Sequence, residues 1–541
     1  MPTLVLYNGP IYTFDPGQPV ARALAIRDGR VFAVGTEGRV QAAVAGQRGE
    51  TINLRGRAVV PGLTDAHVHI VFQGLTAREA RLGEAASLDD ALAVVAGRAR
   101  DLPPGAWLRG WGWDHIPWGR RWPTRADLDA VCPDRPAMLT RKDGHSLWVN
   151  SRALALAGVT ADTPDPAGGQ IQRDRDGEPT GVLLESAMEL VRAVVPPVTE
   201  EERLDALRAA LAEALSYGIT SVHIPPGTNH ASGPEALRAL QTLRARGQLA
   251  VRALAYLAQP DLEGALAMGL RSGLGDRWVR LGGLKLFADG SLGSESAEML
   301  SHYEGRRHTG IATLPYEQLE DLVCRANMGG ISVAVHAIGD AANRKVLDAI
   351  ERARQAREQA GPDAPPLALP NRIEHVQVIH QKDLPRLAQL EVIASMQPIH
   401  CTSDIEAADA LWGPRCALAY AWRSLKDSGA TLAFGSDAPV ETMNPWRGVH
   451  AAVTRQRPGG HPAGGWYPEQ RLSAEEALLA YCVGPAIASG EAAEKGRLTV
   501  GALADMAVLT GDPLRSAPAE LHAITAAMTI VEGKVAFERS S

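Results

Sequence analysis

Strand-like and helix-like patterns alternate through the middle of the chain. Eight short apolar runs predict buried strands. They occupy residues 58–66, 219–224, 251–257, 279–287, 331–337, 372–378, 391–398 and 431–437. Between most of them lie stretches rich in Ala, Leu, Glu and Arg with the period of amphipathic helices, such as 199–218 and 340–360. Eight such repeats predict an α/β fold with a (β/α)8 barrel of the TIM type, whose chemistry lies at the C-terminal ends of its strands.

Both ends of the chain show the two-residue period of β-hairpins. Residues 23–35 place two alternating runs about an Asp-Gly turn, and residues 527–538 do the same about Glu-Gly. Residues 496–513 offer further short strands. The simplest arrangement is a small β-sandwich made from residues 1–57 and 489–541. The barrel domain, residues 58–488, is then inserted between the two halves.

One interval is too long for a connection between a strand and its helix. About 130 residues separate the first strand from the helix at 199, so we expect a large insertion at about 72–198. It contains six of the eleven tryptophans: Trp107, Trp111, Trp113, Trp118, Trp122 and Trp148. They are predicted to fill the core of an inserted subdomain. A sharper hypothesis is that some of them line an aromatic substrate pocket.

Composition narrows the class of protein. With 541 residues and 45% hydrophobic positions, the chain is long enough for two or three structural units. A net charge of −7 gives no basic surface for nucleic acid or anionic membranes, so the expected partner is a small-molecule substrate. No apolar segment approaches the ~20 residues that span a bilayer. Five scattered cysteines without CxxC spacing indicate reduced thiols and predict a cytoplasmic location.

Candidate metal ligands gather at the ends of the predicted strands. His67 and His69 follow the first strand, and period-2 alternation would send both imidazoles to the same side. A single His-x-His pair is weak evidence. The other predicted strand ends add Lys285, His336, His375 and Asp437. Six candidate ligands on strands one, four, five, six and eight therefore predict a metal site at the catalytic face of the barrel.

Five motifs in a fixed order carry a resemblance to a known family. They are "PGLTDAHVH", "LKLFADGSLGS", "VHAIGDAAN", "RIEHVQ" and "FGSDAPVETMNPW". Taken together they resemble the amidohydrolase superfamily, and specifically its YtcJ-like branch, which includes N-substituted formamide deformylases. The likeness runs through nearly the whole chain. Where members often read Gly-Ser-Arg-Thr-Ala after the lysine, this chain has Gly-Ser-Glu-Ser-Ala, so Glu295 alters the implied substrate contacts and leaves the metal centre unchanged.

The resemblance implies a ligand set for two divalent metal ions. His67, His69 and Asp437 would bind the more buried ion, and His336 and His375 the second. Lys285 would bridge both after N-carboxylation by CO2. A lysine ammonium cannot ligate a cation, whereas a buried neutral lysine beside divalent charges can add CO2 and become an anionic bridge. Histidine and carboxylate ligands suit Zn2+, with Mn2+, Ni2+ or Fe2+ as alternatives.

This apparatus predicts a hydrolase that acts on an amide-like C–N bond of a small molecule. Metal-bound hydroxide would attack an N-formyl or N-acyl amine, a urea or a cyclic amide, and Asp437 would move the proton to the leaving nitrogen. One alternative is an amino-heterocycle deaminase of the same superfamily. Another is a metal-free, non-catalytic barrel that acts as a binding protein. Barrels of this type often pair, which makes a homodimer a hypothesis.

Several residues keep a second interpretation. Lys285 could be an interior lysine paired with Asp289 or Asp340, and Asp437 could cap a helix. Glu374 is expected to be structural or to support a ligand from behind, and His223, His380 and His400 stay unassigned near strand ends. By the resemblance, His145 is a candidate substrate contact, with a surface-loop histidine as its alternative. Ser291, in the segment after Lys285, is a further candidate for substrate binding.

Overall fold

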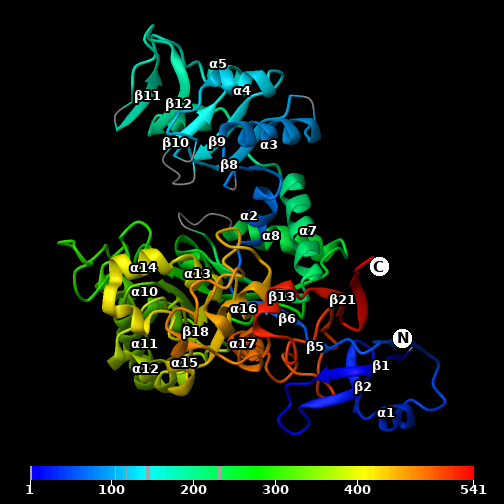
Figure 1. Cartoon of the computed structure of the whole chain (residues 1–541). Helices are drawn as coiled ribbons and strands as arrows, with labels where there is room; N and C mark the ends of the chain where they lie inside the picture. The colour runs from blue at the N-terminus through cyan, green and yellow to red at the C-terminus, as the bar shows by residue number, and fades with distance from the viewer. Residues whose placement is uncertain are drawn as a thin grey trace. The chain divides into compact units, whose positions relative to one another are not determined.

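The chain forms two compact units. The structure is a computed structural model that describes residues 3–83, 85–103, 105–116, 118–141, 146–166, 168–227 and 233–540. One unit combines Met1–Ile70 with Arg208–Ser541, and the other comprises Val71–Leu207. Both are drawn in Figure 1. Each is described by itself below.

The first unit contains a parallel barrel of eight strands, as the sequence predicts. In spatial order the strands are β6 (Leu63–Asp65), β13 (Ile219–Ile224), β14 (Arg252–Leu257), β15 (Val279–Phe287), β16 (Val333–Ala337), β17 (Arg372–His375), β18 (Ile393–Met396) and β19 (Leu432–Phe434). All neighbours in this order pair in parallel. Backbone hydrogen bonds from Ala66 N to Phe434 O (3.0 Å) and from Asp437 N to His67 O (2.7 Å) link the first strand to the last.

Helices follow the barrel strands in sequence. They are α7 (Glu200–Ser216), α8 (Gly233–Ala245), α9 (Leu262–Ala267), α10 (Tyr316–Met328), α11 (Asp340–Ala360), α12 (Leu384–Gln389), α13 (Pro398–Ser403), α14 (Ile405–Trp412), α15 (Trp422–Asp427), α16 (Pro445–Thr454) and α17 (Ala474–Ala488). Helix α11 buries one side from Asp340 to Ala353, which is the amphipathic pattern read from the sequence. None of the helices described is both long enough and apolar enough to cross a membrane.

The first predicted strand, residues 58–66, is in fact two strands in two sheets. Strand β5 (Val59–Pro61) pairs with the strands of the chain ends, and only β6 joins the barrel. The break is at Gly62, where a Cβ would lie 2.1 Å from Thr220 Oγ1. Uniform burial hides this change of sheet in the sequence, because both short strands read as one apolar run.

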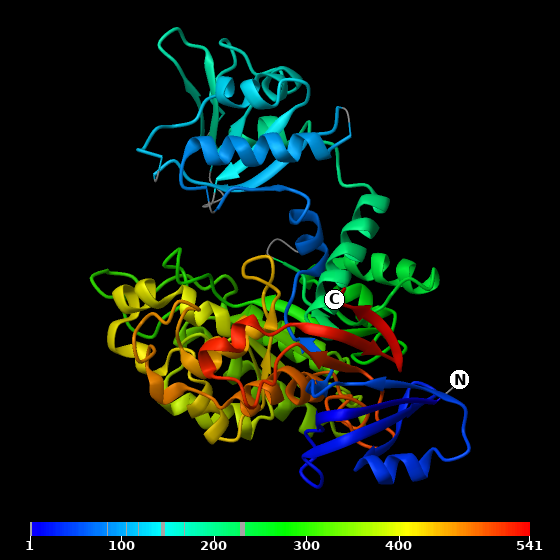
Figure 2. The ribbon, with the colours of Figure 1, turned by 45° about the vertical axis from the view of Figure 1, so that its right-hand side comes forward.

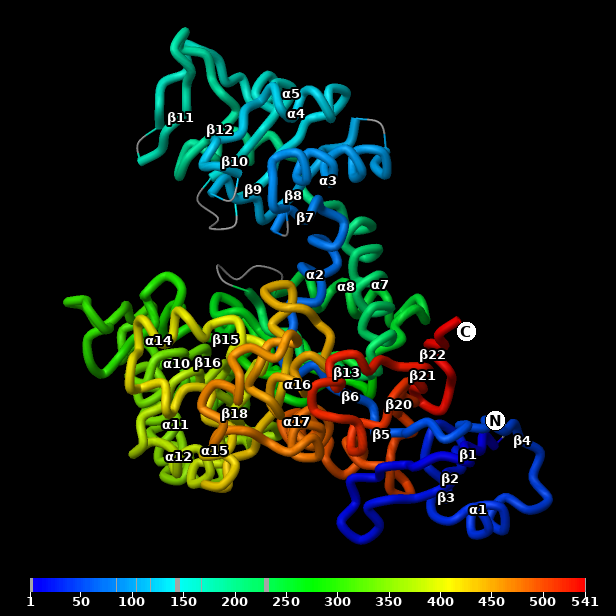
Figure 3. The backbone as a smooth tube through the Cα atoms, in the orientation of Figure 1, coloured from blue at the N-terminus to red at the C-terminus, as the bar shows by residue number. Residues whose placement is uncertain are grey.

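Strands from both ends of the chain form one sheet. Its order is β22 (Lys534–Glu538), β21 (Ala526–Val531), β20 (Met506–Leu509), β5, β1 (Thr3–Tyr12), β2 (Val20–Arg27) and β3 (Arg30–Gly35), with β4 (Gly49–Asn53) paired to β1. The two hairpins expected from the sequence are present as β2–β3 and β21–β22. Residues of both ends, among them Leu24, Met506 and Ile530, share one hydrophobic core. Figure 3 shows β5 and β20 where the two ends meet.

The second unit is built on a six-stranded sheet of its own. The strand order is β11 (Gly169–Arg173), β12 (Pro179–Glu185), β10 (Ser146–Val149), β9 (Ala137–Arg141), β8 (Leu108–Trp113) and β7 (Ala80–Arg81). Its helices are α3 (Leu88–Asp101), α4 (Arg125–Val131), α5 (Ser151–Leu156) and α6 (Met188–Arg192), with α2 (Ile70–Thr76) leading in. Figure 2 shows α3 lying along this sheet.

Most of the tryptophans in this unit fill its core. Trp113 and Trp148 are fully buried, and Trp118 and Trp122 pack in the same cluster. Only Trp111, which is 51% exposed, keeps a large free face. The described contacts therefore support the prediction that these tryptophans fill the core of the inserted subdomain.

Candidate metal centre

The first and last barrel strands bring three candidate ligands together. His67 and His69 follow β6, and Asp437 follows β19. The Nε2 atoms of His67 and His69 lie 3.5 and 3.1 Å from Oδ1 of Asp437. Ligand bonds of about 2.1 Å would place neighbouring donors around a tetrahedral ion roughly 3.4 Å apart. The spacing of these three donor atoms fits a metal ion.

The backbone is shaped to bring these groups close. A Cβ on Gly435 would lie 2.4 Å from the backbone nitrogen of His67, so only glycine fits where the two strand ends meet. Asp437 itself has a φ of 60°, in the left-handed region that non-glycine residues seldom occupy. Asp65 accepts hydrogen bonds from the backbone and the hydroxyl of Ser436 at 2.9 and 2.5 Å, which ties the two segments together. The β6 strand ends at Asp65, so the two imidazoles converge through this loop geometry and not through strand alternation.

A second pair of histidines stands beside the first. His336 on β16 and His375 at the end of β17 have ring centroids 4.6 Å apart, and the rings of His375 and His67 are 5.1 Å apart. His375 has a φ of 80°, which turns the chain at the strand end. The four histidines therefore lie in one cluster, in which His67 and His375 are buried and His69 and His336 are partly exposed.

In each of these four imidazoles, one ring nitrogen faces an oxygen that holds the ring in place. The pairs are His67 Nδ1 with Glu374 Oε2 (2.5 Å), His69 Nδ1 with Pro225 O (3.0 Å), His336 Nε2 with Gly290 O (2.9 Å) and His375 Nδ1 with Gln397 Oε1 (2.8 Å). An N–H on that nitrogen leaves a lone pair on the other one. Metal-ligating histidines are fixed in this way. The residues present thus fit a pair of metal ions.

Burial favours the neutral imidazole that a metal requires. Burial, aided by the charge of Lys285, lowers the pKa of His67 to about 4 and that of His336 to about 3. Burial also holds the pKa of His375 well below its ordinary value. These rings are unprotonated at neutral pH and available as ligands.

Lys285 lies among these groups on β15 and is 1% exposed. Its Nζ lies 4.8 Å from the centroid of the Phe287 ring, and among the described residues it makes no ion pair within 4.0 Å. The alternative partner Asp289 accepts backbone hydrogen bonds from residues 298, 338 and 339 instead, and Asp340 accepts one from Leu300. Burial lowers the pKa of the lysine to about 8, so a sizeable fraction of the amine is neutral near neutral pH.

Glu374 supports the ligand His67 from behind, which is one of the two roles expected from the sequence. Its Oε1 accepts a hydrogen bond from Nε of Arg372 at 2.5 Å. Its Oε2 contacts Nδ1 of His67. Although burial opposes ionisation, Arg372 and His67 hold the pKa of Glu374 well below its usual range. Arg372 also donates to Tyr256 and to the backbone of Ala66, so one buried guanidinium anchors the back of the site.

His400 is the site residue that sequence reasoning left unassigned. It lies on α13, is 7% exposed, and its Nε2 is 3.2 Å from Oδ2 of Asp437. Its Nδ1 faces Oε1 of Glu441 at 3.9 Å. Although burial opposes protonation, these two carboxylates raise the pKa of His400 to about 10. The ligand atoms of His375, His400 and Asp437 all lie within 4.8 Å of one another.

Asp437 does not cap a helix, which removes its alternative interpretation. The next helix, α16, begins at Pro445 and is capped by the side chain of Asn444. Burial opposes the ionisation of Asp437, but hydrogen bonds with His400 and His69 hold its pKa well below the usual range. The carboxylate is therefore ionised at neutral pH.

Only one of the two candidate substrate-binding residues can be located. His145 lies outside the described residues. Ser291 is exposed on the loop after β15, where its hydroxyl meets that of Ser294 at 2.9 Å. Glu295 is neutralised by a two-point contact with Arg306, at 2.8 and 2.9 Å.

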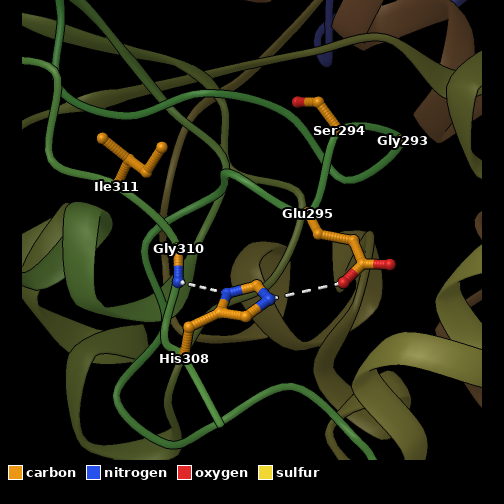
Figure 4. Close-up of a pocket in the computed structure, with 6 residues that line it drawn as sticks. All are labelled: Gly293, Ser294, Glu295, His308, Gly310 and Ile311. Atoms are coloured by element: carbon orange, nitrogen blue, oxygen red, sulfur yellow. Dashed lines mark hydrogen bonds and ion pairs between the residues drawn. The ribbon is translucent and has the colours of Figure 1, made fainter. Parts of the chain in front are cut away.

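Glu295 and His308 line a pocket of about 530 Å³ in this loop. Figure 4 shows the carboxylate of Glu295 turned toward the imidazole of His308, 3.4 Å away, and the other ring nitrogen accepting a hydrogen bond from Gly310. Ile311, Gly293 and Ser294 complete the lining. The pocket therefore combines one carboxylate and one imidazole with one exposed apolar side chain.

Comparison with known proteins places this site in a family. The sequence matches the Amidohydrolase family over residues 50–537. The chain belongs to this family. It is 32% identical to "Putative amidohydrolase YtcJ" of Bacillus subtilis, over 99% of both chains. It is 30% identical to "N-substituted formamide deformylase" of Arthrobacter pascens, over 100% of this chain and 99% of the relative.

A solved structure agrees with the family assignment. An uncharacterised metal-dependent hydrolase from Pyrococcus furiosus superposes with a TM-score of 0.76 at 30% identity, over 95% of this chain and 100% of the other. The amidohydrolase is therefore a metal-dependent hydrolase of this family. The resemblance read from the five motifs is confirmed, including its YtcJ-like branch.

Proposed function

We propose that this amidohydrolase hydrolyses an amide-like C–N bond of a small molecule, such as an N-formyl or N-acyl amine, a urea or a cyclic amide. The observation that carries the proposal is the cluster of four histidines, each with one nitrogen held by an oxygen, beside Asp437 and Lys285. The name of the deformylase relative points to the same bond class for that protein.

Two divalent ions, with Zn2+ as the first candidate, would be held by the residues described. His67, His69 and Asp437 would hold one, and His336 and His375 the other. When bound, such ions lower the pKa of a water molecule to about 7 and polarise a carbonyl oxygen. The neutral imidazoles of His67, His336 and His375 add no positive charge that would oppose this effect.

Asp437 is the proposed proton carrier. Its carboxylate is ionised and lies among the histidines, where an attacking water would stand. It would take the proton as the water oxygen attacks the carbonyl carbon and then pass that proton to the leaving nitrogen. An amine leaves far more readily when it is protonated, so one carboxylate serves both steps.

Lys285 is the proposed bridge between the ions, in the form of a carbamate. The neutral amine would attack the carbon of CO2, the new N–C bond would form as one C=O electron pair moves to oxygen, and one N–H proton would leave. Burial supports this step because it increases the neutral fraction of the amine. The anionic product would offer two oxygens as ligands, whereas an ammonium would repel a cation.

Substrate selection is proposed to lie in the loops beyond the barrel strands. Ser291 offers a hydroxyl on the loop that begins beside His336, because Gly290 O contacts that ring. His145 is kept as a second candidate contact. Glu295 and Arg306 form a neutral pair, so Arg306 is not a free cation for an anionic substrate.

The test is metal analysis joined to a substrate screen. Protein purified without chelators should contain close to two equivalents of metal and should hydrolyse members of an N-formyl and N-acyl amine panel with added Zn2+ or Mn2+ and bicarbonate. About one equivalent, with release of ammonia from amino-heterocycles, would favour a deaminase. Absence of bound metal in protein that is folded would indicate a binding protein and would refute the proposal.

A further inference from the structure

Strand β18 supplies no candidate ligand, yet the segment that follows it touches both halves of the centre. Gln397 and His400 lie at the start of α13, three residues apart. Gln397 Oε1 is 2.8 Å from Nδ1 of His375. His400 Nε2 is 3.2 Å from Oδ2 of Asp437. One short segment therefore reaches a ligand of each proposed metal site.

We infer that Gln397 and His400 are positioning residues, with Gln397 orienting His375 for one metal ion and His400 orienting Asp437 for the other. The inference rests on the proposed two-metal centre. It assigns a separate metal site to each residue, so the two residues should have separable effects.

The carboxylate of Asp437 is divided between two sets of contacts. Oδ1 faces the Nε2 atoms of His67 and His69, whereas Oδ2 faces His400. A carboxylate held at one oxygen cannot rotate freely, so its other oxygen stays directed at the histidine pair. His400 thus fixes which oxygen of Asp437 is presented to a metal.

The ring of His400 lies between two carboxylates, as the ring of His67 also does. Both of its nitrogens face carboxylates, Asp437 on one side and Glu441 on the other, and Glu441 also accepts a hydrogen bond from Ser403 at 2.5 Å. The four ligand rings each face a fixing oxygen with one nitrogen, and those of His67 and His69 face Oδ1 of Asp437 with the other. The contact of its Nε2 with Oδ2 of Asp437, at 3.2 Å, is the one through which His400 orients that ligand.

Local structure holds the segment rigidly. Pro398 occupies the first turn of α13, where its fixed φ suits the helix start. Gln397 and His400 are 1% and 7% exposed, and the backbone nitrogen of His400 donates to Gln397 O at 3.1 Å. A buried, anchored segment can hold two ligands in place without contributing to the metal coordination.

The experiment measures zinc affinity in backgrounds that retain one site each. His336→Ala should keep the site of His67, His69 and Asp437, and His69→Ala should keep the other. Adding His400→Leu should weaken zinc binding about 10- to 100-fold in the His336→Ala background and by less than about 3-fold in the His69→Ala background. Gln397→Leu should show the reverse pattern. Competition with a chromophoric chelator gives the affinities.

Conservative variants and a matched histidine complete the design. His400→Gln retains a hydrogen-bond donor toward Asp437, and Gln397→Glu retains an acceptor for His375. Both variants should therefore recover most of the zinc affinity that the Leu variants lose. His380→Leu serves as the control, because the Nδ1 of His380 contacts Arg344 and the backbone of Lys382 and not the centre. Circular dichroism and thermal unfolding of the metal-free proteins check that every variant is folded at the temperature of the binding measurement.

The outcomes separate the inference from the proposed function. Wild-type protein that binds no zinc would overturn the two-metal centre itself and this inference with it. Wild-type protein that binds two ions while His400→Leu and Gln397→Leu leave affinity unchanged, or weaken both sites equally, would overturn only the positioning roles. Failure of the Gln and Glu variants to rescue would also overturn them, because it would show that packing and not hydrogen bonding matters.

Discussion

At the residue scale, the centre depends on which nitrogen of each histidine is left free. The free nitrogen is set by an oxygen that contacts the other one. These oxygens belong to the backbone of Pro225 and Gly290 and to the side chains of Glu374 and Gln397. Such contacts come from residues far away in the sequence. A ligand set can therefore be recognised from strand ends, whereas the groups that orient it emerge only when the strands are side by side.

Asp437→Asn should abolish turnover, with kcat falling at least about 10³-fold, because an amide cannot accept and return a proton. The protein should still fold, since the amide has the same shape and keeps Oδ1. The measurement is steady-state hydrolysis of the best substrate from the screen, with circular dichroism as the folding check. An Asn variant with wild-type kcat would remove Asp437 from the proton path.

Lys285→Ala should lower metal content as well as activity, because the proposed carbamate is the shared ligand. Elemental analysis should show the loss of one or both ions, in parallel with kcat. Lys426→Ala is the matched control, a 41% exposed lysine that pairs with Glu476. Equal metal content in the Lys285 variant and in the control would contradict the bridging role.

At the element scale, the sequence predicted the strands well but not every boundary. All eight barrel strands fall within their predicted ranges. The run at 58–66 divides at Gly62 between two sheets, which periodicity cannot reveal because both pieces are buried. His375 and Asp437 leave their strands with left-handed backbone, so the direction of these side chains could not follow from alternation.

Helix α17 offers an element-scale prediction with a pH dependence. Glu476 forms a capping box with Ser473. Its carboxylate also forms ion pairs with Arg423 and Lys426 of α15. Burial opposes ionisation, but Arg423 and the backbone of Ser473 together lower the pKa of Glu476 to about 2. A depressed folded pKa contributes stability that is complete above the unfolded value of 4.5 and is lost as pH falls toward 2.

Glu476→Gln should therefore cost about 1 kcal/mol of unfolding free energy at pH 7. The difference from wild type should shrink below pH 4.5 and vanish near pH 2. Urea unfolding at several pH values measures it. Glu475→Gln, at the neighbouring exposed position in the same helical turn, removes an equal charge and should change stability by less than about 0.5 kcal/mol.

At the scale of the whole molecule, both chain ends return to one sheet beside the barrel. A buried ion pair joins the two parts: Arg252 on β14 donates to Asp505, ahead of β20, at 2.6 and 3.0 Å. The side chains are 2% and 5% exposed. Asp505 also accepts from the backbone of Glu532 at 2.8 Å, so it links the barrel to the C-terminal hairpin.

Asp505→Asn should destabilise the protein by about 3–5 kcal/mol, because it leaves the charge of Arg252 buried without compensation. Glu494→Gln is the control, since its partner Arg30 is 30% exposed and such pairs contribute about 0–1 kcal/mol. Chemical denaturation followed by far-ultraviolet circular dichroism compares the two. Similar losses in both variants would show that the buried pair is no more important than an exposed one.

The sequence by itself determined the barrel, the terminal hairpins and the six candidate ligands, because burial period and strand-end position are local properties that each segment carries alone. Tertiary structure alone decided the division of residues 58–66, the contact of Glu374 with His67, and the places of Gln397 and His400. These features depend on which strands become neighbours and how their backbones turn at the ends. Hydrogen bonds across such distances are set by packing, and no local pattern encodes them.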